Sequence, residues 1–477
     1  MAATTLRHEY ANSGWVPAAL AMVALAVGSG YALAVGELAG LYIALALLGS
    51  VAVLLDFRVG AVLLLLMLPM SQSSLFPRSL MQINGLNPLN LLLAATVASY
   101  VISGRARTAG PALRQPVLWL LIVPICVAAF IGLPHVHEVP AMVTDTGSYI
   151  TPFTNERGYL VLSLTKAVVI PVIALMIGAA AARAQKPERF ILAIAASAWI
   201  TVLVQLAFIV LQGVPLADMA APEERSFYTP IGMHANTLGR MHMFVLALLL
   251  FVWVDCRQPR LRLFLMVTMG AVALALVLTF SRAAMAGALL VGVLFLVWKF
   301  NVRSLTLVIL GGAFVALLGG AAIWMRLTYG FGEGANAVSA GRIDGIWLPL
   351  LPELWKSPLW GNGLQSILWS FPMQTGAIVA VGHPHSAYLE SLLDMGFLGT
   401  ALLLAYFAHV WKGFRALSKD AALSPEMRAL FQGASACLLA FFLTCIVGSS
   451  FRPEADSAYL WIAIGLMYGM LARRPAK

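Results

Sequence analysis

The chain contains one apolar run after another of about 20 residues, and this repetition constrains its fold more than any other feature. A run of this length can cross the hydrocarbon core of a membrane as a helix. Only 10% of the 477 residues are charged, against about 25% in a typical soluble domain. An outer-membrane barrel would instead show segments of about ten residues with alternating hydrophobicity. The sequence therefore predicts an all-α polytopic membrane protein.

We predict about 12–14 transmembrane helices, the lower number applying if the short run 59–70 does not cross the membrane. The predicted spans cover residues 16–35, 39–55, 59–70, 88–103, 116–133, 159–182, 189–212, 236–254, 261–280, 283–300, 304–324, 388–411, 428–448 and 457–472. They form a single integral membrane domain over 1–477. Its expected parts are N-terminal helices in 16–182, a core in 189–411 and C-terminal helices in 412–477.

The net charge of +10 comes from Lys and Arg in short loops between every second pair of spans. Examples are Arg105, Arg183, Arg257, Lys299 and Lys412. This distribution follows the positive-inside rule, so it accounts for the basic charge without a nucleic-acid partner. It places both termini on the cytoplasmic side and the long loops 134–158, 214–235 and 325–385 on the opposite side. Long loops in a compact architecture are usually functional.

The loop 325–385 is rich in tryptophan and carries apolar residues at helical spacing between Ile343 and Leu354. Tryptophan favours the headgroup region of a membrane, and amphipathic helices lie in the plane of that region. We therefore predict short amphipathic helices in this loop, interrupted by Pro349 and Pro352.

Several cationic residues fall at the mouths of the predicted helices on the side of the long loops. They are Arg225, Arg240, Arg282, Arg342 and Arg452, with Lys166 about two turns inside its span. Ionisable groups at membrane depth favour a functional hypothesis, and the alternative is that each side chain reaches headgroup phosphate. A group of arginines would suit a diphosphate, because the guanidinium binds phosphate oxygens in pairs.

The segment VGHPHSAYLESLLDMGFLG, residues 381–399, begins with two histidines at the entrance to a predicted span. If a helix starts near Pro384, then Gly396 and Gly399 lie on the face of His385, while Glu390 and Asp394 point away from it. His385 is either a base that accepts a hydroxyl proton or an interfacial histidine. The glycines predict a close approach by another backbone.

The sequence predicts no metal or cofactor. His383 and His385 have no third ligand at a suitable spacing, and the same holds for His135 and His137. There is also no glycine-rich phosphate loop and no Asp-x-Asp pair for a nucleotide-sugar donor.

Four stretches together resemble the motifs of the O-antigen ligase and polymerase superfamily. His385-Ser386 followed by nine residues and Gly396-Phe-Leu-Gly399 is similar to the family signature. The others are Thr279-Phe-Ser-Arg282, Ser339-Ala-Gly-Arg342 with the following Trp347, and Lys356-Ser-Pro-Leu-Trp-Gly-Asn-Gly363. The resemblance covers roughly residues 190–410.

The resemblance implies a metal-independent glycosyltransferase in the bacterial inner membrane, with its active site facing the periplasm. Such enzymes transfer a glycan from undecaprenyl diphosphate to a hydroxyl of lipid A-core, as ligases, or of another lipid-linked repeat, as polymerases. It implies that His385 acts on the acceptor hydroxyl and that Arg282 and Arg225 hold the donor diphosphate. We further expect substrate contacts from Arg342, His383, Arg452 and Arg240. Besides the donor and the acceptor, membrane lipids are the only partners expected.

A polysaccharide transporter or flippase is the alternative from another functional class. A transporter would have charged residues along a path to both faces and broken helices at the midplane of the membrane. Here the unusual charges gather at one face, which favours chemistry on a lipid-linked substrate. No motif in the sequence distinguishes a ligase from a polymerase; our leading hypothesis is a ligase that uses lipid A-core as acceptor, and a polymerase that uses the same donor is the alternative.

Overall fold

The computed structural model of the chain describes residues 49–74, 79–80, 83–84, 87–102, 116–140, 153, 155–213, 215, 219, 227–379, 381–448 and 450–473. These residues are mainly helical, with one short antiparallel hairpin of β1 (Ser79–Leu80) and β2 (Ile83–Asn84). The predicted span 16–35 and most of the span 39–55 lie outside the described residues.

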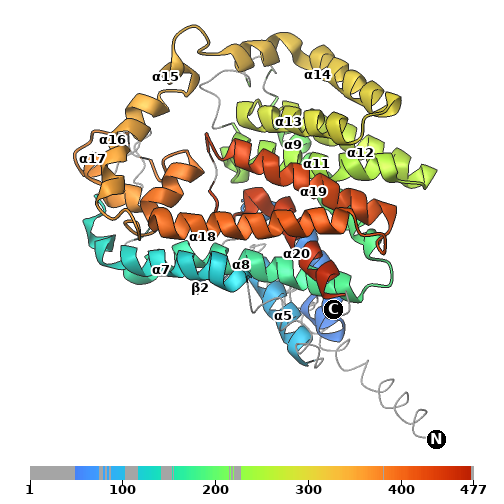
Figure 1. Cartoon of the computed structure of the whole chain (residues 1–477), viewed down its shortest axis with the longest axis horizontal. Helices are drawn as coiled ribbons and strands as arrows, with labels where there is room; N and C mark the ends of the chain where they lie inside the picture. The colour runs from blue at the N-terminus through green and yellow to red at the C-terminus, as the bar shows by residue number, and fades with distance from the viewer. Residues whose placement is uncertain are drawn as a thin grey trace, which may run out of the picture.

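The first part of the chain forms several helical segments. They are α4 (Phe57–Met67), η1 (Leu68–Met70), α5 (Pro88–Ile102), η3 (Val117–Ile122), α7 (Val123–Gly132) and η4 (Leu133–Glu138). The body of the molecule is a bundle (Figure 1) of α8 (Glu156–Arg183), α9 (Phe190–Gln212), α11 (Ala235–Asp255), α12 (Pro259–Val277), α13 (Arg282–Trp298), α14 (Val302–Thr328), α18 (Ala387–Ser418), α19 (Pro425–Thr444) and α20 (Ala458–Ala472).

Eight helical segments of the described chain are long and apolar enough to cross a membrane. Large apolar side chains such as Val210 and Leu289 are exposed on the outside of the bundle, where lipid would cover them. The structure therefore confirms an all-α polytopic membrane protein. Most predicted spans in the described chain agree with the observed helices to within a few residues; for example, the span predicted at 189–212 is α9. The span predicted at 388–411 is an exception, because α18 continues to Ser418.

The centre of the bundle is formed by α11, α19 and α20, most of whose residues are buried. Small residues allow α8 and α20 to lie unusually close together. A methyl group added at Gly178 would lie 2.2 Å from the carbonyl oxygen of Gly465, and one at Gly465 would lie 2.0 Å from that of Ala174. Close backbone approach at small residues is the usual way in which membrane helices associate.

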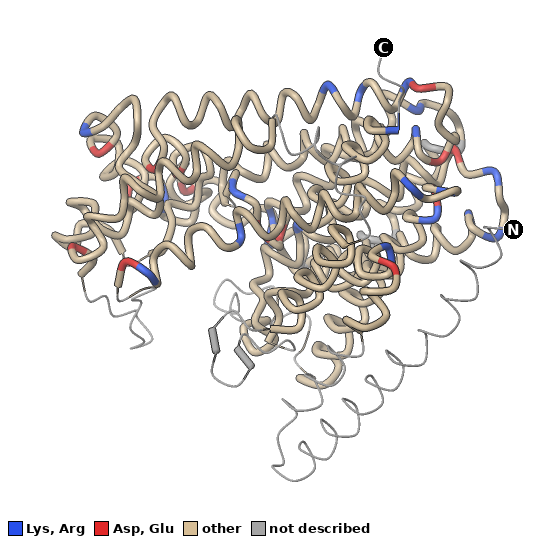
Figure 2. The backbone as a smooth tube through the Cα atoms, turned by 90° about the horizontal axis from the view of Figure 1, so that it is seen from below, with Lys and Arg blue, Asp and Glu red and all other residues tan. Residues whose placement is uncertain are grey.

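The two ends of the bundle differ in charge. Short turns connect α11 to α12, α12 to α13, α13 to α14 and α18 to α19, so these neighbours are antiparallel. Figure 2 shows Lys and Arg concentrated at the end where α20 finishes, with some Asp and Glu among them, whereas Lys and Arg are fewer at the opposite end. At the basic end, Arg473 donates to the carbonyl of Ala184 and Lys299 pairs with Asp255. The opposite end carries the loops in which we predicted the site.

The loop 325–385 forms a series of short helical turns at that opposite end (Figure 1). They are α15 (Ala335–Val338), η8 (Ile343–Trp347), α16 (Leu348–Leu350), η9 (Leu351–Trp355), η10 (Ser366–Trp369) and α17 (Phe371–Gln374). Trp355 and Trp360 are exposed, as expected at a headgroup layer.

The prediction that Pro349 and Pro352 interrupt these helices was wrong. The backbone stays helical and changes pitch instead, from a π-helical turn to an α-helical and then a 3₁₀ turn. Each proline is the second residue of its segment, next to the point at which the pitch changes.

Candidate functional site

Arg282 is positioned by a tight turn between α12 and α13. Phe280 takes a left-handed backbone conformation (φ 48°), and Ser281 caps α13 by accepting a hydrogen bond from Ala284 N. Arg282 is the first residue of α13, and its guanidinium donates to the carbonyls of Tyr329 (3.0 Å) and Val338 (3.1 Å). These carbonyls orient the guanidinium without neutralising its charge. The Thr-Phe-Ser-Arg motif therefore sets the direction of one arginine.

The Ser-Ala-Gly-Arg motif positions Arg342 in a similar way. Ala340 and Gly341 both have positive φ, and Ser339 accepts a hydrogen bond from Ile343 N at 3.3 Å. Arg342 donates to the carbonyl of Val447 at 2.7 Å, in the connection between α19 and α20. Two separate turns therefore aim two arginines toward the same region.

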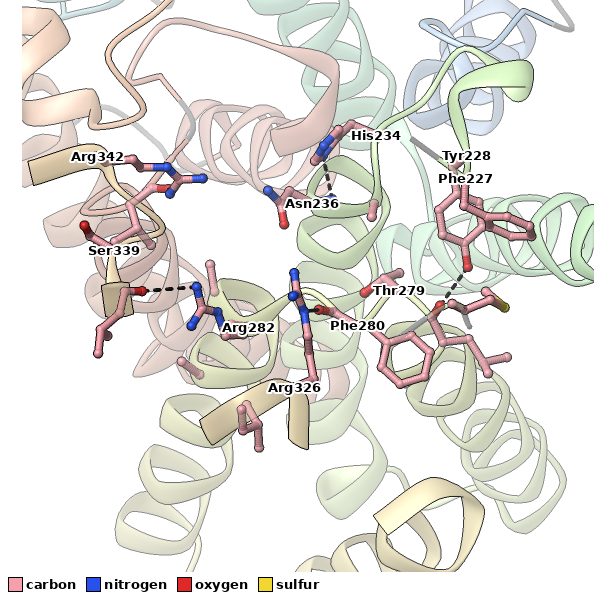
Figure 3. A pocket seen from close by; sticks show the side chains of 18 of the residues that line it. Phe227, Tyr228, His234, Asn236, Thr279, Phe280, Arg282, Arg326, Ser339 and Arg342 are labelled. Carbon is pink, nitrogen blue, oxygen red and sulfur yellow. Dashed lines mark hydrogen bonds between the residues drawn. The ribbon is translucent and has the colours of Figure 1, made fainter. Parts of the chain in front are cut away.

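Arg282, Arg326 and Arg342 line one cavity of about 330 Å³, which we call the arginine cavity (Figure 3). Arg326 comes from the last turn of α14, is buried, and donates to the carbonyl of Phe280 at 3.3 Å. No acidic residue is among the described residues that line this cavity, whose remaining wall includes Phe227, Tyr228, Phe280 and Phe331. The arginine cavity is thus cationic next to an apolar wall, which suits an amphiphilic anion.

Sequence reasoning missed Arg326. The signal was present, because an arginine stands two residues after the span predicted at 304–324. The predicted residue Arg225 lies outside the described part of the chain. Lys166 is exposed on α8 and lines neither cavity among the residues described here.

The histidine segment differs from the helix that we predicted to start near Pro384. The helix α18 begins at Ala387, after Ser386, whose hydroxyl accepts a hydrogen bond from Leu389 N. His385 precedes the helix and has a left-handed backbone (φ 54°). Left-handed residues other than glycine are uncommon, and histidine is among the types enriched there. The argument from a shared helical face of His385 and Gly396 was therefore wrong.

His383 and His385 line a second cavity of about 350 Å³, which we call the histidine cavity. Arg240, Arg452 and Glu390 line it as well, so four predicted residues meet there. Our expectation that Glu390 points away from His385 was wrong, because Glu390 borders the same space. It does so as the ion-pair partner of Arg452.

Both arginines of the histidine cavity are paired with carboxylates. Arg240 is paired with Asp456, and Arg452 with Glu390, and the four side chains are largely buried. Removing one partner of a buried ion pair leaves an uncompensated charge, so such pairs hold their residues firmly in place. Arg240 and Arg452 thus differ from the arginines of the other cavity, which contact carbonyls.

The surroundings of His383 lower the pKa of its ring. The residue is exposed to solvent overall, but neighbouring protein atoms remove part of the water around the imidazole. This partial desolvation lowers the pKa of His383 below its usual value. The cations Arg240, Arg342 and Arg452 lower the pKa further, and Glu390 opposes them.

The arginine and histidine cavities adjoin one another, because His234 and Asn236 line both. His234 caps α11 by accepting a hydrogen bond from Asn236 N at 3.1 Å, and the amide oxygen of Asn236 meets Ser281 Oγ at 2.8 Å. Figure 3 shows both residues across the arginine cavity from Arg282 and Arg342. Neither was predicted from the sequence, where a polar pair at the start of a span looks like an ordinary helix cap.

The glycine of the signature breaks α18. Gly396 has φ 64° and ψ −171°, a region that only glycine occupies readily. The break frees backbone groups, and residues 358–363 bind them. Asn362 N and Gly363 N donate to Leu393 and Asp394 carbonyls, while Phe397 N and Leu398 N donate to Pro358 and Leu359 carbonyls. The predicted close approach at Gly396 is thus made by this loop.

The loop in turn reaches the histidine cavity. The Asp394 carboxylate accepts hydrogen bonds from Gln365 N (2.9 Å), Ser366 N (3.0 Å) and Ser366 Oγ (2.9 Å). Gln365 lines the histidine cavity. The motif Lys356–Gly363 therefore supports one wall of the cavity and provides no cavity-lining side chain of its own among those described. The described residues also contain no group of three or more His, Cys, Asp or Glu side chains that could hold a metal ion.

Comparisons with known proteins agree with the motifs. A search of curated proteins found no match. Residues 267–404 match the family model for the O-antigen ligase. The matched range contains Arg282, Arg326, Arg342 and the whole segment from His383 to Gly399. This part of the chain is therefore similar to the O-antigen ligase family.

Proposed function

We propose that this protein transfers a glycan from an undecaprenyl-diphosphate donor to a hydroxyl of lipid A-core, without a metal ion or a nucleotide. The observation that carries the proposal is the pair of adjoining cavities, one cationic beside an apolar wall and the other bordered by two histidines. A lipid-linked diphosphate needs the first environment. An acceptor hydroxyl that must lose a proton needs the second.

The donor diphosphate would lie among Arg282, Arg326 and Arg342. Each guanidinium can bind two phosphate oxygens, and no acidic residue among the described lining competes for them. The start of the lipid chain would lie against the aromatic side of the cavity, which includes Phe280. Arg225, which lies outside the described residues, would add a further contact to the diphosphate.

His385 would accept the proton of the acceptor hydroxyl. The hydroxyl oxygen then attacks the anomeric carbon of the glycan, and the bond between that carbon and the diphosphate oxygen breaks. The electron pair leaves with the diphosphate, whose charge the three arginines stabilise. A positioned base typically contributes about 10²–10⁴-fold in rate.

Arg240, Arg452 and His383 would shape the acceptor side. The two arginines are held by Asp456 and Glu390, so they present fixed N–H groups to an acceptor sugar. His234 and Asn236 would lie where the donor and the acceptor meet, since they border both cavities.

The positive-inside rule supports the proposed location. The basic loops would face the cytoplasm of a bacterial cell, and the cavities at the other end of the bundle would open to the periplasm. The active site would then face the compartment in which lipid-linked glycans are handed to surface acceptors.

The test uses purified protein in nanodiscs with a radiolabelled undecaprenyl-diphosphate glycan and lipid A-core, in EDTA and without ATP. The wild-type protein should form labelled lipid A-core. His385→Ala should reduce transfer by at least about 10²-fold. His137→Ala is the matched control, because His137 is an exposed histidine next to Glu156 and lines neither cavity. A requirement for added metal, or full activity of His385→Ala, would refute the mechanism.

The acceptor distinguishes a ligase from a polymerase. The same reaction is run with lipid A-core, with a second lipid-linked repeat, and with both together. We expect transfer to lipid A-core. Extension of the lipid-linked repeat alone would identify a polymerase that uses the same donor cavity.

A further inference from the structure

We propose that His383 and Trp347 are positioning residues, which together hold the Pro384–His385 peptide group so that the His385 ring faces the acceptor. This inference rests on the proposed function of His385. In this inference the side chain of His383 holds the backbone of the site in place, and it does not contact the substrate.

The peptide group between Pro384 and His385 is held at both of its polar atoms. Its carbonyl oxygen accepts a hydrogen bond from Trp347 Nε1 at 2.8 Å. Its N–H donates to His383 Nδ1 at 3.2 Å. The two partners come from different segments, η8 and the residues just before α18. A peptide plane that is held on both edges cannot rotate without losing both bonds.

The residues after His385 are fixed as well. Ala387 N donates to the carbonyl of Cys445 at 2.9 Å, and Ser386 caps α18. His385 therefore lies between a clamped peptide group and an anchored helix start. Its positive φ is the torsion that joins these two fixed parts, so the clamp determines the direction of its side chain.

The hydrogen bond also fixes the tautomer of His383. A backbone N–H is always a donor, so the Nδ1 atom that accepts from it carries no proton. In a neutral ring the proton must then be on Nε2. His383 consequently offers no basic nitrogen to the cavity, and the proton-accepting role is left to His385. The rings are in contact, with centroids 4.1 Å apart, so the orientation of one constrains the other.

Asparagine and glutamine substitutions separate this role from substrate contact. The amide oxygen of Asn occupies the position of histidine Nδ1, and Asn readily accepts a hydrogen bond from the N–H two residues on. The amide group of Gln instead lies near the position of histidine Nε2, so it does not replace Nδ1 as the acceptor. His383→Asn keeps the clamp, whereas His383→Gln and His383→Ala remove it.

We expect His383→Asn to retain kcat within about threefold of wild type, and His383→Gln and His383→Ala to lose about tenfold, which corresponds to about 1.4 kcal/mol in the barrier. The KM values for donor and acceptor should change little. Trp347→Phe removes the other half of the clamp and should lower kcat by a similar factor. Transfer is measured as above, with the protein's elution in gel filtration as the check on folding.

Each other outcome overturns the inference. If His383→Gln is active and His383→Asn is not, His383 acts on the substrate through Nε2. If the three variants at His383 are equally active or equally impaired, the hydrogen bond to His385 N does not matter. If Trp347→Phe keeps the full wild-type kcat, the hydrogen bond from Trp347 to the Pro384 carbonyl does not position His385, and the inference is also wrong. A failure of the proposed function looks different, because wild type would then transfer no glycan or His385→Ala would stay active.

Discussion

Gly396→Ala should destabilise the protein strongly, because two separate costs add at this residue. The conformation at Gly396, φ 64° and ψ −171°, costs a residue with a side chain about 1–3 kcal/mol. The new methyl group would also lie 2.5 Å from Gly361 N and from the carbonyl group of Leu359, and overpacking of this kind costs about 1–3 kcal/mol. The expected loss is therefore about 2–6 kcal/mol in the free energy of unfolding.

The assay is unfolding of the purified protein in detergent micelles, titrated with sodium dodecyl sulfate and followed by tryptophan fluorescence. Gly292→Ala is the matched control, since Gly292 lies within α13 with no atom within 4 Å of an added methyl group. It should change stability by no more than about 1 kcal/mol. If Gly396→Ala unfolds at the same detergent fraction as Gly292→Ala, the helix break is not fixed by the loop 358–363, and our account of the signature glycine is wrong.

Three further predictions concern charged residues. Arg452→Ala should destabilise the protein by about 3–5 kcal/mol by leaving Glu390 buried and unpaired, and adding Glu390→Gln should recover part of the loss in the same titration. Burial raises the pKa of Glu454, so the stability that it contributes is present below its unfolded pKa and lost as the pH rises through its folded value. Glu454→Gln should therefore gain in melting temperature over wild type from about pH 5 to about pH 8, and a constant difference would contradict this. Arg326→Gln should raise KM for the lipid-linked donor at least about tenfold and leave KM for the acceptor unchanged, whereas the exposed control Arg260→Gln should change neither.

The positions of the long helices could be predicted from the sequence because membrane insertion depends on local composition. The span predicted at 236–254 is α11, Ala235–Asp255, and the span predicted at 457–472 is α20, Ala458–Ala472. The helix α20 is apolar along its whole length and α11 from Met243 to Val254, and no tertiary contact is needed to explain these runs. The charges at one end of the bundle were predictable for the same reason, since each stands at the edge of an apolar run.

The start of α18 could not be decided locally, because two signals competed. Pro384 is a favoured first-turn residue, and Ser386 is a favoured N-cap. The cap prevailed because the backbone on either side of it is held by contacts with residues that are distant in the sequence, Trp347 before it and Cys445 after it. The same applies to the pair of Glu390 and Arg452, which lie 62 residues apart. A helical-wheel argument cannot show such a partner.

The fixed spacing of the signature follows from the structure between its two ends. Residues 387–395 form an unbroken helical segment of about 13 Å, from the anchor at Ala387 to the break at Gly396. Glu390 and Asp394 are four residues apart and therefore share a face of this segment. Glu390 meets Arg452 in the histidine cavity, and Asp394 holds the backbone of Gln365, which also lines that cavity. A change of one residue in this spacing would rotate one carboxylate away by about 100°. The distance in sequence between the histidine and the glycine thus keeps both walls of the cavity in register, although the two residues never share a helical face.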